Sequence, residues 1–435
     1  MLKGCLTVLT ALAVLSVPPA AFGQEKEFDK TALPNGMTVL TQRCGGDLIS
    51  ACLFIDVGSA DESPENNGIS KLLAQVLLSC YPLGNASPPP LKVEQLGGRV
   101  TVDVRQDFTC YTLVAPAQKF WDALKVLAEA LKAPQCVDAA VGQEKTALAA
   151  ARNRAEDRLE EKGLRTFMRV SYGGMTYGLD PDGSEKGLAA VGRAELVNWH
   201  RSYYKPPNML LSVCGRLVTA QTVKQVEEAF TDWPVISTKK AGTSRHGGEG
   251  IRSGTHVEES RSGSAVVMGY TSPRTGSPDY PSMLAVEAML VDGMGSGVFR
   301  ALRDKNVLAY NFGGLLPPMR DTSRLVFYVV TDEDKLDGAV REIEDTVRSV
   351  SEGNFSEEEL QRAKGRAAGG LLMRRETSLG KAWWGGMYEF YGVGAQYGDS
   401  CREQVGRLEK ADLTKAAQQY LGAPAIVIYR KPGGK

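Results

Sequence analysis

The sequence predicts an α+β fold of two similar domains, each an antiparallel-rich sheet with helices packed on it. Two observations predict this. One order of strands and helices occurs twice along the 435 residues, and the repeated unit is too long for a solenoid. Between the two copies, residues 237–256 are rich in Gly, Ser and charged residues, which is typical of a linker. We therefore expect domains at 27–236 and 257–435.

The first half is expected to open with a strand at 50–58, "SACLFIDVG", and a helix at 66–80. Polar and apolar residues alternate over 97–116, which predicts a hairpin. The remaining expected elements of this half are helices at 118–133, 138–162 and 193–203 and a strand at 208–215. The run "SPPP" at 87–90 is expected to be a stiff surface loop.

The second half repeats this order, beginning with the strand "SAVVMGYTS" at 264–272. The further expected elements are a helix at 279–291, strands at 308–316 and 323–331, helices at 333–352, 356–378 and 409–420, and a strand at 424–431. Trp383 and Trp384 are expected to pack as a cluster at a helix end.

The N-terminus has the pattern of a secretory signal peptide. Lys3 supplies a positive charge, an apolar stretch too short to span a bilayer comfortably follows, and Ala21 and Gly23 offer small residues for cleavage before Gln24. A membrane anchor is the alternative, and it fits the short stretch less well. Residues 1–23 are thus a predicted signal peptide, and we expect an exported, periplasmic protein without a transmembrane segment in the mature chain.

Charge and cysteine content exclude some classes of protein. Lys plus Arg and Asp plus Glu both number 51, so there is no basic excess of the kind that general nucleic-acid binders show. The cysteines are scattered without a C-x-x-C pair, which fits neither a zinc ribbon nor a dense disulfide scaffold. Three cysteines lie in apolar runs and are expected to be buried: Cys52, Cys110 and Cys214. One disulfide is possible, but the sequence does not identify its two cysteines.

Several landmarks, taken in their order and spacing, resemble the insulinase/pitrilysin zinc peptidases, the inverzincins with H-x-x-E-H on a helix. The segments that carry the resemblance are "LPNGMTVL" (33–40), "VGSADESPENNGIS" (57–70), "LGGRVTVDVRQDFTCY" (96–111), "YGLDPDG" (177–183), "YYKPPNMLLSVCG" (203–215) and "GMGSGVFRALRDKNVLAY" (293–310). The similarity covers nearly all of 27–431. It implies the fold of the mitochondrial processing peptidase.

The sequence departs from the family at the metal site. Where the family has H-x-x-E-H, this chain reads Lys71, Leu72, Leu73, Ala74, Gln75. Two imidazoles one helical turn apart hold the zinc in such a motif, and the carboxylate takes a proton from the metal-bound water. Lys71 is a cation, Ala74 cannot act as a base, and Gln75 offers one weak oxygen. The family's third ligand is a Glu on a later helix, and the corresponding position here is Ala151. We expect no metal and no cofactor in this chain.

A second metal site would have to use the three histidines, His200, His246 and His256. His200 is expected on a helix, and the other two lie in the predicted linker. We expect them to be solvated or hydrogen-bonded.

The second half retains an Arg and a Tyr seven residues apart, Arg303 and Tyr310. The resemblance implies that such a pair contacts the substrate backbone and the developing oxyanion, which suits a planar guanidinium and a phenolic donor. The alternative is a surface Arg in a helix and a core Tyr that opens a strand. The glycine-rich "GMGSG" at 293–297 lacks the Lys-Ser/Thr of a P-loop, so a tight turn or a flexible lip is expected.

In the family that this chain resembles, some members divide H-x-x-E-H and the Arg–Tyr pair between two chains, so the resemblance implies a non-catalytic, substrate-binding subunit of a heterodimeric zinc peptidase. The zinc and the base would come from a homologous H-x-x-E-H partner, and the two chains would close around an unfolded peptide. Two alternatives stay open: an inactive scaffold subunit of an envelope complex, and a stand-alone peptide-binding protein.

Overall fold

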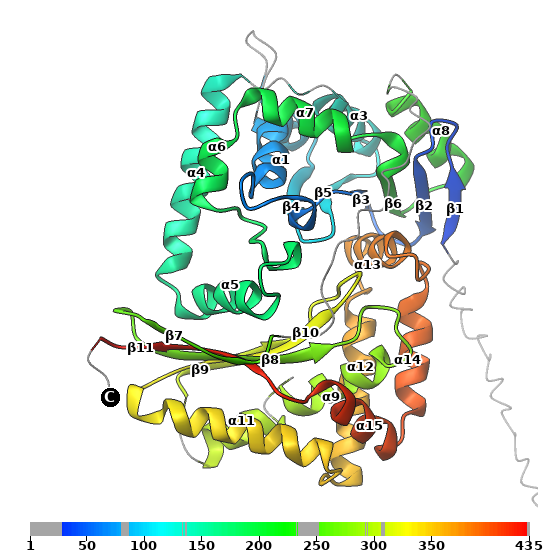
Figure 1. Cartoon of the computed structure of the whole chain (residues 1–435). Coiled ribbons are helices and arrows are strands. Elements are labelled where there is room, and N and C mark those ends of the chain that lie inside the picture. The colour runs from blue at the N-terminus through cyan, green and yellow to red at the C-terminus, as the bar shows by residue number, and fades with distance from the viewer. Residues whose placement is uncertain are drawn as a thin grey trace, which may run out of the picture.

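The computed structural model describes residues 28–79, 87–132, 134, 137–231, 233, 252–291, 293, 295–305 and 309–432. It contains two sheets, each with its own layer of helices (Figure 1), so the predicted α+β class is confirmed. The predicted signal peptide and residues 237–251 of the predicted linker lie outside these ranges. Within the described ranges, we find no helix that is both long and apolar enough to cross a membrane.

The first sheet has six strands in the order β1-β2-β6-β3-β5-β4. Its strands are β1 (Asp29–Ala32), β2 (Thr38–Arg43), β3 (Leu48–Ile55), β4 (Arg99–Val104), β5 (Thr109–Pro116) and β6 (Met209–Gly215). Only the pair β2–β6 is parallel. The hairpin expected at 97–116 is therefore confirmed as β4 and β5.

The helices of this half depart from the sequence prediction in several places, and helices at 185–190 and 219–229 were not predicted. They are α1 (Ile69–Ser79), α2 (Pro89–Gln95), α3 (Phe120–Lys132), α4 (Asp138–Glu156), α5 (Leu159–Ser171), α6 (Glu185–Ala190), α7 (Arg193–Tyr203) and α8 (Thr219–Ala229), with short 3₁₀ turns η1 (Ser59–Asp61), η2 (Thr176–Gly178) and η3 (Pro206–Asn208). The single helix expected at 138–162 is wrong, because the chain turns at Asp157–Arg158 and α5 starts in a new direction. The loop expected at 87–90 instead opens α2, since proline fits the first turn of a helix.

The second sheet has the order β7-β11-β8-β10-β9 and contains one parallel pair, β7–β11. Its strands are β7 (Gly254–Glu259), β8 (Ser264–Ser272), β9 (Asn311–Leu315), β10 (Ser323–Thr331) and β11 (Ala425–Arg430). Its half also contains α9 (Tyr280–Leu290), α10 (Gly297–Phe299), the π-helical turn η4 (Arg300–Lys305), η5 (Glu333–Lys335), α11 (Leu336–Ser351), α12 (Glu357–Met373), α13 (Ser378–Phe390), α14 (Tyr397–Arg407) and α15 (Lys410–Tyr420). β7 starts inside the segment expected to be a linker.

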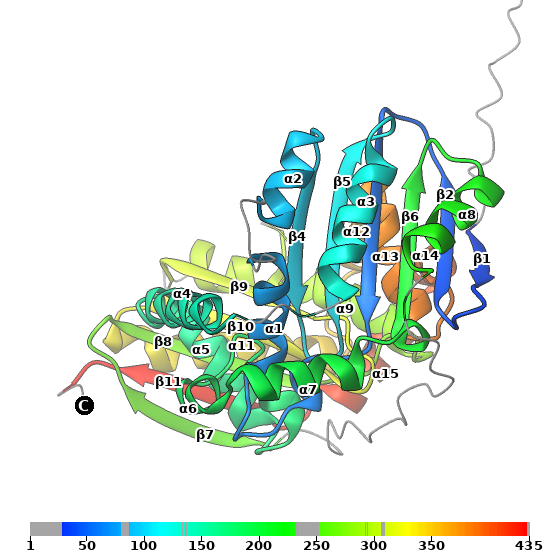
Figure 2. The same ribbon diagram turned by 90° about the horizontal axis from the view of Figure 1, so that it is seen from above.

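The two halves exchange one helix each. Helix α13, from the second half, covers the free face of the first sheet, and α5, from the first half, covers the free face of the second sheet (Figures 1 and 2). Each sheet is thus buried on both faces. Successive residues of β3 show this, since Ala51 and Leu53 point into the core of the first half while Cys52 and Phe54 point to α13.

Glycines allow both exchanged helices to approach their sheets closely. A Cβ atom on Gly386 of α13 would lie 2.5 Å from the Phe54 ring, and one on Gly163 of α5 would lie 2.6 Å from a methyl group of Val267. Both distances are shorter than van der Waals contact, so a side chain at either position would push the helix away from the sheet. Trp383 packs beside Phe54 in the same cluster, inside α13 and not at a helix end.

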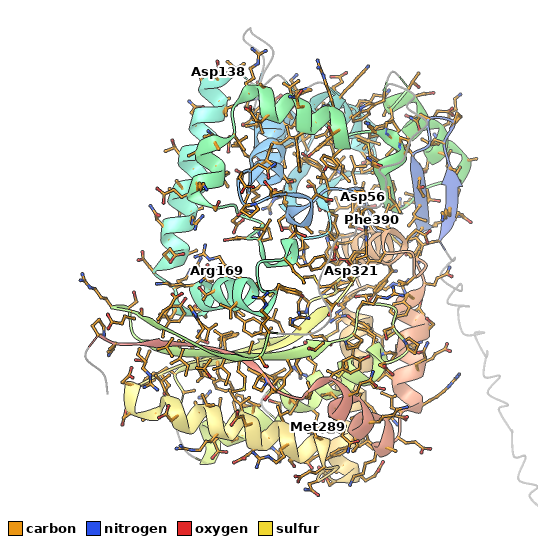
Figure 3. The ribbon with its side chains drawn as sticks, viewed as in Figure 1. Asp56, Asp138, Arg169, Met289, Asp321 and Phe390 are labelled. Carbon is orange, nitrogen blue, oxygen red and sulfur yellow. The ribbon has the colours of Figure 1, made fainter. Side chains whose placement is uncertain are left out.

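A buried carboxylate joins the halves at their junction. Asp107, in the β4–β5 turn, accepts hydrogen bonds from the Tyr177 and Tyr391 hydroxyl groups and, at 3.0 Å, from the backbone N–H of Arg320. The Arg320 guanidinium in turn donates to Asp56 at 3.0 Å and lies 4.6 Å from the centre of the Phe390 ring. Figure 3 shows Asp56 and Phe390 next to each other where the two halves meet.

We predict that Gly386→Val destabilises the protein, because the added methyl groups would overlap Phe54 and separate α13 from the first sheet. Overpacking of this kind typically costs about 1–3 kcal/mol. The control is Gly365→Ala on α12, where a Cβ would have no neighbour within 4 Å. That change should stabilise the helix by roughly 0.5–1 kcal/mol. Urea titrations of the three proteins measure both effects, and a Gly386→Val protein as stable as the parent would contradict the close packing.

Candidate functional site

The helix that would hold the metal in a zinc peptidase is α1. Its N-terminus is capped by the side chain of Glu62. The buried carboxyl group of Glu62 accepts hydrogen bonds from the backbone N–H groups of Gly68 at 2.7 Å and Ser70 at 2.9 Å, and from the Asn67 amide at 2.8 Å. These donors are among those that a helix start leaves without intrahelical partners. Burial raises the pKa of Glu62, while the hydrogen bonds oppose that rise.

The residues at the ligand positions do not fit a zinc ion. The Lys71 ammonium lies 3.3 Å from a carboxylate oxygen of Asp182, so a cation with its own counter-ion is already present there. Ala74 is fully buried and apolar. Gln75 has a buried side-chain oxygen that accepts no hydrogen bond from the described residues. Ala151 lies exposed on α4. One amide oxygen beside an ammonium group cannot replace two imidazoles and two carboxylates.

The structure adds a second cation at this place. Arg152, the neighbour of Ala151, donates from its guanidinium to the carbonyl oxygen of Gly183 at 2.6 Å. Arg152 and Lys71 therefore both bind the 180–183 loop, one through a backbone carbonyl and the other through Asp182. Sequence reasoning found Lys71 but missed Arg152 and Asp182, because only the tertiary structure brings the loop to α1 and α4.

No other group of metal ligands replaces this site within the described part of the chain. No cluster of three or more His, Cys, Asp or Glu side chains there has an arrangement that could hold a metal ion. His200 is buried on α7, with Nε2 2.7 Å from the Leu131 carbonyl oxygen, and burial lowers its pKa. His256 pairs with Glu258 at 2.8 Å on β7, and His246 lies outside the described residues.

Arg303 and Tyr310 occupy exposed positions in the second half. Arg303 lies in η4, with its guanidinium 5.6 Å from the centre of the Phe299 ring. Tyr310 directly precedes β9 and is 72% exposed, so the alternative that it is a core residue is wrong. Its hydroxyl donates to Asp332 at 2.6 Å, and Lys335 donates to the same carboxylate at 3.0 Å.

This small cluster fixes the direction of the Tyr310 hydroxyl. The hydrogen bond to Asp332, together with the negative charge of that carboxylate, raises the pKa of Tyr310. The hydroxyl proton points to Asp332 in this arrangement. Asp332 and Lys335 were not identified from the sequence, because they approach Tyr310 only through the pairing of β9 with β10, where Asn311 lies opposite Val330.

Comparison with known proteins identifies the family of this chain. Residues 38–177 match the family model for insulinase (peptidase family M16), and residues 190–366 match the model for the peptidase M16 inactive domain. An uncharacterized zinc protease of Mycobacterium tuberculosis is 23% identical over 354 residues, covering 80% of either chain. One of Bacillus subtilis is 22% identical over 329 residues, covering 76% of this chain and 80% of its own.

Solved structures show the same fold. A protease from Helicobacter pylori superposes with a TM-score of 0.86 at 20% identity, covering 93% of this chain and 99% of its own. A peptidase M16 inactive domain from Pseudomonas fluorescens gives 0.85 at 17% identity, covering 94% and 99%. The fold is thus that of M16-like peptidases, and α1 carries Lys71, Ala74 and Gln75 at the positions where the sequence analysis expects H-x-x-E-H. The chain belongs to the insulinase (M16) peptidase family.

We predict that Glu62→Gln destabilises the protein by about 1–3 kcal/mol, because an amide N–H₂ would face backbone N–H groups that need acceptors. The matched control is Glu65→Gln, an exposed position three residues further on, which should change stability by less than about 0.5 kcal/mol. Thermal unfolding at neutral pH compares the two. Equal midpoints for both variants would show that Glu62 does not secure the start of α1.

Proposed function

We propose that this chain is the non-catalytic, substrate-binding subunit of a heterodimeric, exported zinc peptidase. The observation that carries the proposal is that α1 is preserved with its cap while its ligand positions hold Lys71, Ala74 and Gln75. A chain of this kind can contribute a wall of a peptide cavity, but the metal and the base must come from another chain. That chain would be a homologue with an intact H-x-x-E-H helix.

An unfolded peptide would be held by groups that bind backbone. Among the described strands β9 pairs only with β10, so its outer edge presents N–H and C=O groups to an extended chain. Tyr310 stands at the start of this edge, and Arg303 precedes it on η4. In the complex, the Tyr310 hydroxyl would turn from Asp332, which keeps Lys335 as a partner, and donate to the carbonyl oxygen under attack. Arg303 would bind a neighbouring carbonyl.

Export is part of the proposal and depends on residues 1–23. A positive charge, a short apolar stretch and small residues before Gln24 support a cleaved signal peptide. The partner would then carry a similar signal, since the two chains must meet in one compartment. The periplasm is the compartment that we propose.

We predict that the purified chain holds no stoichiometric zinc and cleaves no peptide, because the residues at the ligand positions do not fit the metal. Co-expression with an exported H-x-x-E-H relative should give a one-to-one complex whose peptidase activity is lost with a chelator. Elemental analysis and size-exclusion chromatography with light scattering measure the two parts. The proposal would be contradicted by one tightly held zinc per isolated chain, or by a chain that stays monomeric when it is co-expressed with each such relative.

We predict that Tyr310→Phe lowers the turnover of the complex by roughly a hundredfold to a thousandfold, the usual effect of removing one oxyanion donor. The ring is kept, so the thermal midpoint should stay unchanged. Arg303→Lys, which keeps the charge but loses the planar fork, should also lower turnover. The matched control is Tyr420→Phe, which removes another hydroxyl that donates to a carboxylate, Asp279, at 2.8 Å.

Two outcomes separate this function from the alternatives. Normal turnover in both Tyr310→Phe and Arg303→Lys, at unchanged stability, would favour a purely structural subunit. Binding of unfolded peptides by the isolated chain, with no gain from any zinc-bearing relative, would favour a stand-alone peptide-binding protein.

A further inference from the structure

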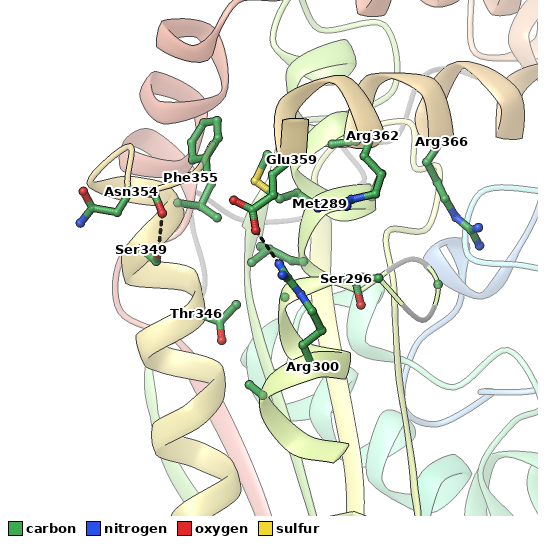
Figure 4. Close-up of a pocket in the computed structure, with 18 of the residues that line it drawn as sticks. Met289, Ser296, Arg300, Thr346, Ser349, Asn354, Phe355, Glu359, Arg362 and Arg366 are labelled. Carbon is green, nitrogen blue, oxygen red and sulfur yellow. Dashed lines mark hydrogen bonds and ion pairs between the residues drawn. The ribbon is translucent and has the colours of Figure 1, made fainter. Parts of the chain in front are cut away.

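A second candidate binding site lies in the second half, on the side of its sheet opposite α5. It is a groove with a volume of about 460 Å³ between α11 and α12, and its floor is formed by the end of α9 and the glycine-rich turn before α10 (Figure 4). None of its lining residues belongs to α1 or β9, but Arg300 and Ala301 lie on η4, the turn that also carries Arg303.

The two long walls carry opposite chemistry. Five residues of α11 line the groove at helical spacing, and so do four of α12, which means that one face of each helix points inward. The α11 wall consists of Glu342, Asp345, Thr346, Ser349 and Val350, and the α12 wall of Glu359, Arg362, Ala363 and Arg366. One wall is therefore acidic and hydroxylic. The other is mainly basic, and Arg300 reaches Glu359 from the floor at 2.5 Å.

The floor contains a buried polar group without a partner. Ser296 is 3% exposed, and its hydroxyl accepts and donates no hydrogen bond within the described residues, although it lines the groove. Buried hydroxyl groups are rarely left in this state. Figure 4 shows Ser296 and Arg300 below the α12 wall, in the order in which the chain enters α10 and η4. A ligand in the groove would supply the missing partner.

The glycine-rich turn at 293–297 has a backbone conformation that favours glycine. Gly293 has a φ of +90°, and a Cβ on it would lie 2.7 Å from the guanidinium carbon of Arg366. Glycine is therefore needed both for the backbone and for the close contact with the α12 wall. The tight turn that the sequence predicted for "GMGSG" thus brings Ser296 to the foot of a basic helix face.

The charges of the lining decide the class of ligand. Three guanidinium groups (Arg300, Arg362, Arg366) and three carboxylates (Glu342, Asp345, Glu359) balance to zero. A phosphate-like anion would meet three carboxylates as well as the arginines. A ligand with one positive and one negative end satisfies both walls at once, and Met289, Val350 and Phe355 offer an apolar surface to its body.

We propose that this groove binds a short peptide with free termini. Its carboxylate would bind Arg362, whose present partner Glu358 is 3.3 Å away and 86% exposed, and a pair so exposed exchanges at little cost. Its ammonium group would lie at Glu342 and at Asp345, whose present partner Arg348 is 3.1 Å away and 62% exposed. A peptide amide would bind the Ser296 hydroxyl. The volume suits a chain of a few residues. This inference does not depend on the heterodimer.

We predict that the full chain binds the tripeptide Ala-Leu-Ala in isothermal titration calorimetry, and that amidating its C-terminus or acetylating its N-terminus each weakens binding about tenfold or more. Arg362→Gln should weaken binding of the free tripeptide but leave binding of the amidated tripeptide unchanged. Asp345→Asn should weaken binding of the free tripeptide but leave binding of the acetylated tripeptide unchanged. Ser296→Ala, which removes one oxygen and leaves folding intact, should weaken all three peptides.

The control is Arg341→Gln, an equal loss of charge at an exposed position of α11 outside the lining, which should leave the affinity unchanged. Three outcomes overturn the proposal: no heat of binding at millimolar tripeptide, equal affinity for the free and both blocked peptides, or competition by inorganic phosphate at the affinity of the tripeptide itself. The last would show a simple anion site.

Discussion

The exchange of one helix between the halves is the constraint on which the rest of the structure depends. Each sheet is apolar on both faces and can be buried only if the other half supplies a cover. Helix α13 fits the first sheet through Gly386, and α5 fits the second through Gly163. Neither half could therefore be removed without exposing an apolar sheet face of the other. The shared carboxylate of Asp107 adds directional bonds to this non-directional packing.

This frame holds α1 in place without any contribution from metal ligands. A structural zinc contributes folding free energy, but a catalytic one is held by a helix that already exists for other reasons. Here α1 is fixed by its apolar face in the core of the first half and by the Glu62 cap at its start. Lys71 stands at the first position of the expected H-x-x-E-H motif, and its ammonium group pairs with Asp182. The lysine side chain itself thus supplies the positive charge at this position.

The second half carries two polar surfaces that the core does not use. Tyr310 is held by Asp332 at an edge of the second sheet, and the groove between α11 and α12 combines an acidic wall with a basic one. Both features lie on surfaces that do not close a core, so they can change without disturbing packing. Selection and orientation of a peptide is the role that we propose for these surfaces.

The sequence by itself determined the fold class, the duplicated order of strands and helices, and the loss of the zinc ligands, because these follow from local periodicity and from residue types at fixed spacing. Tertiary structure alone decided that the helix expected at 138–162 breaks, that α13 forms and crosses to the other half, and that Arg152 joins Lys71. These depend on contacts between residues distant in sequence. A run such as β3 indicates burial on both faces, but it cannot say which helix covers each.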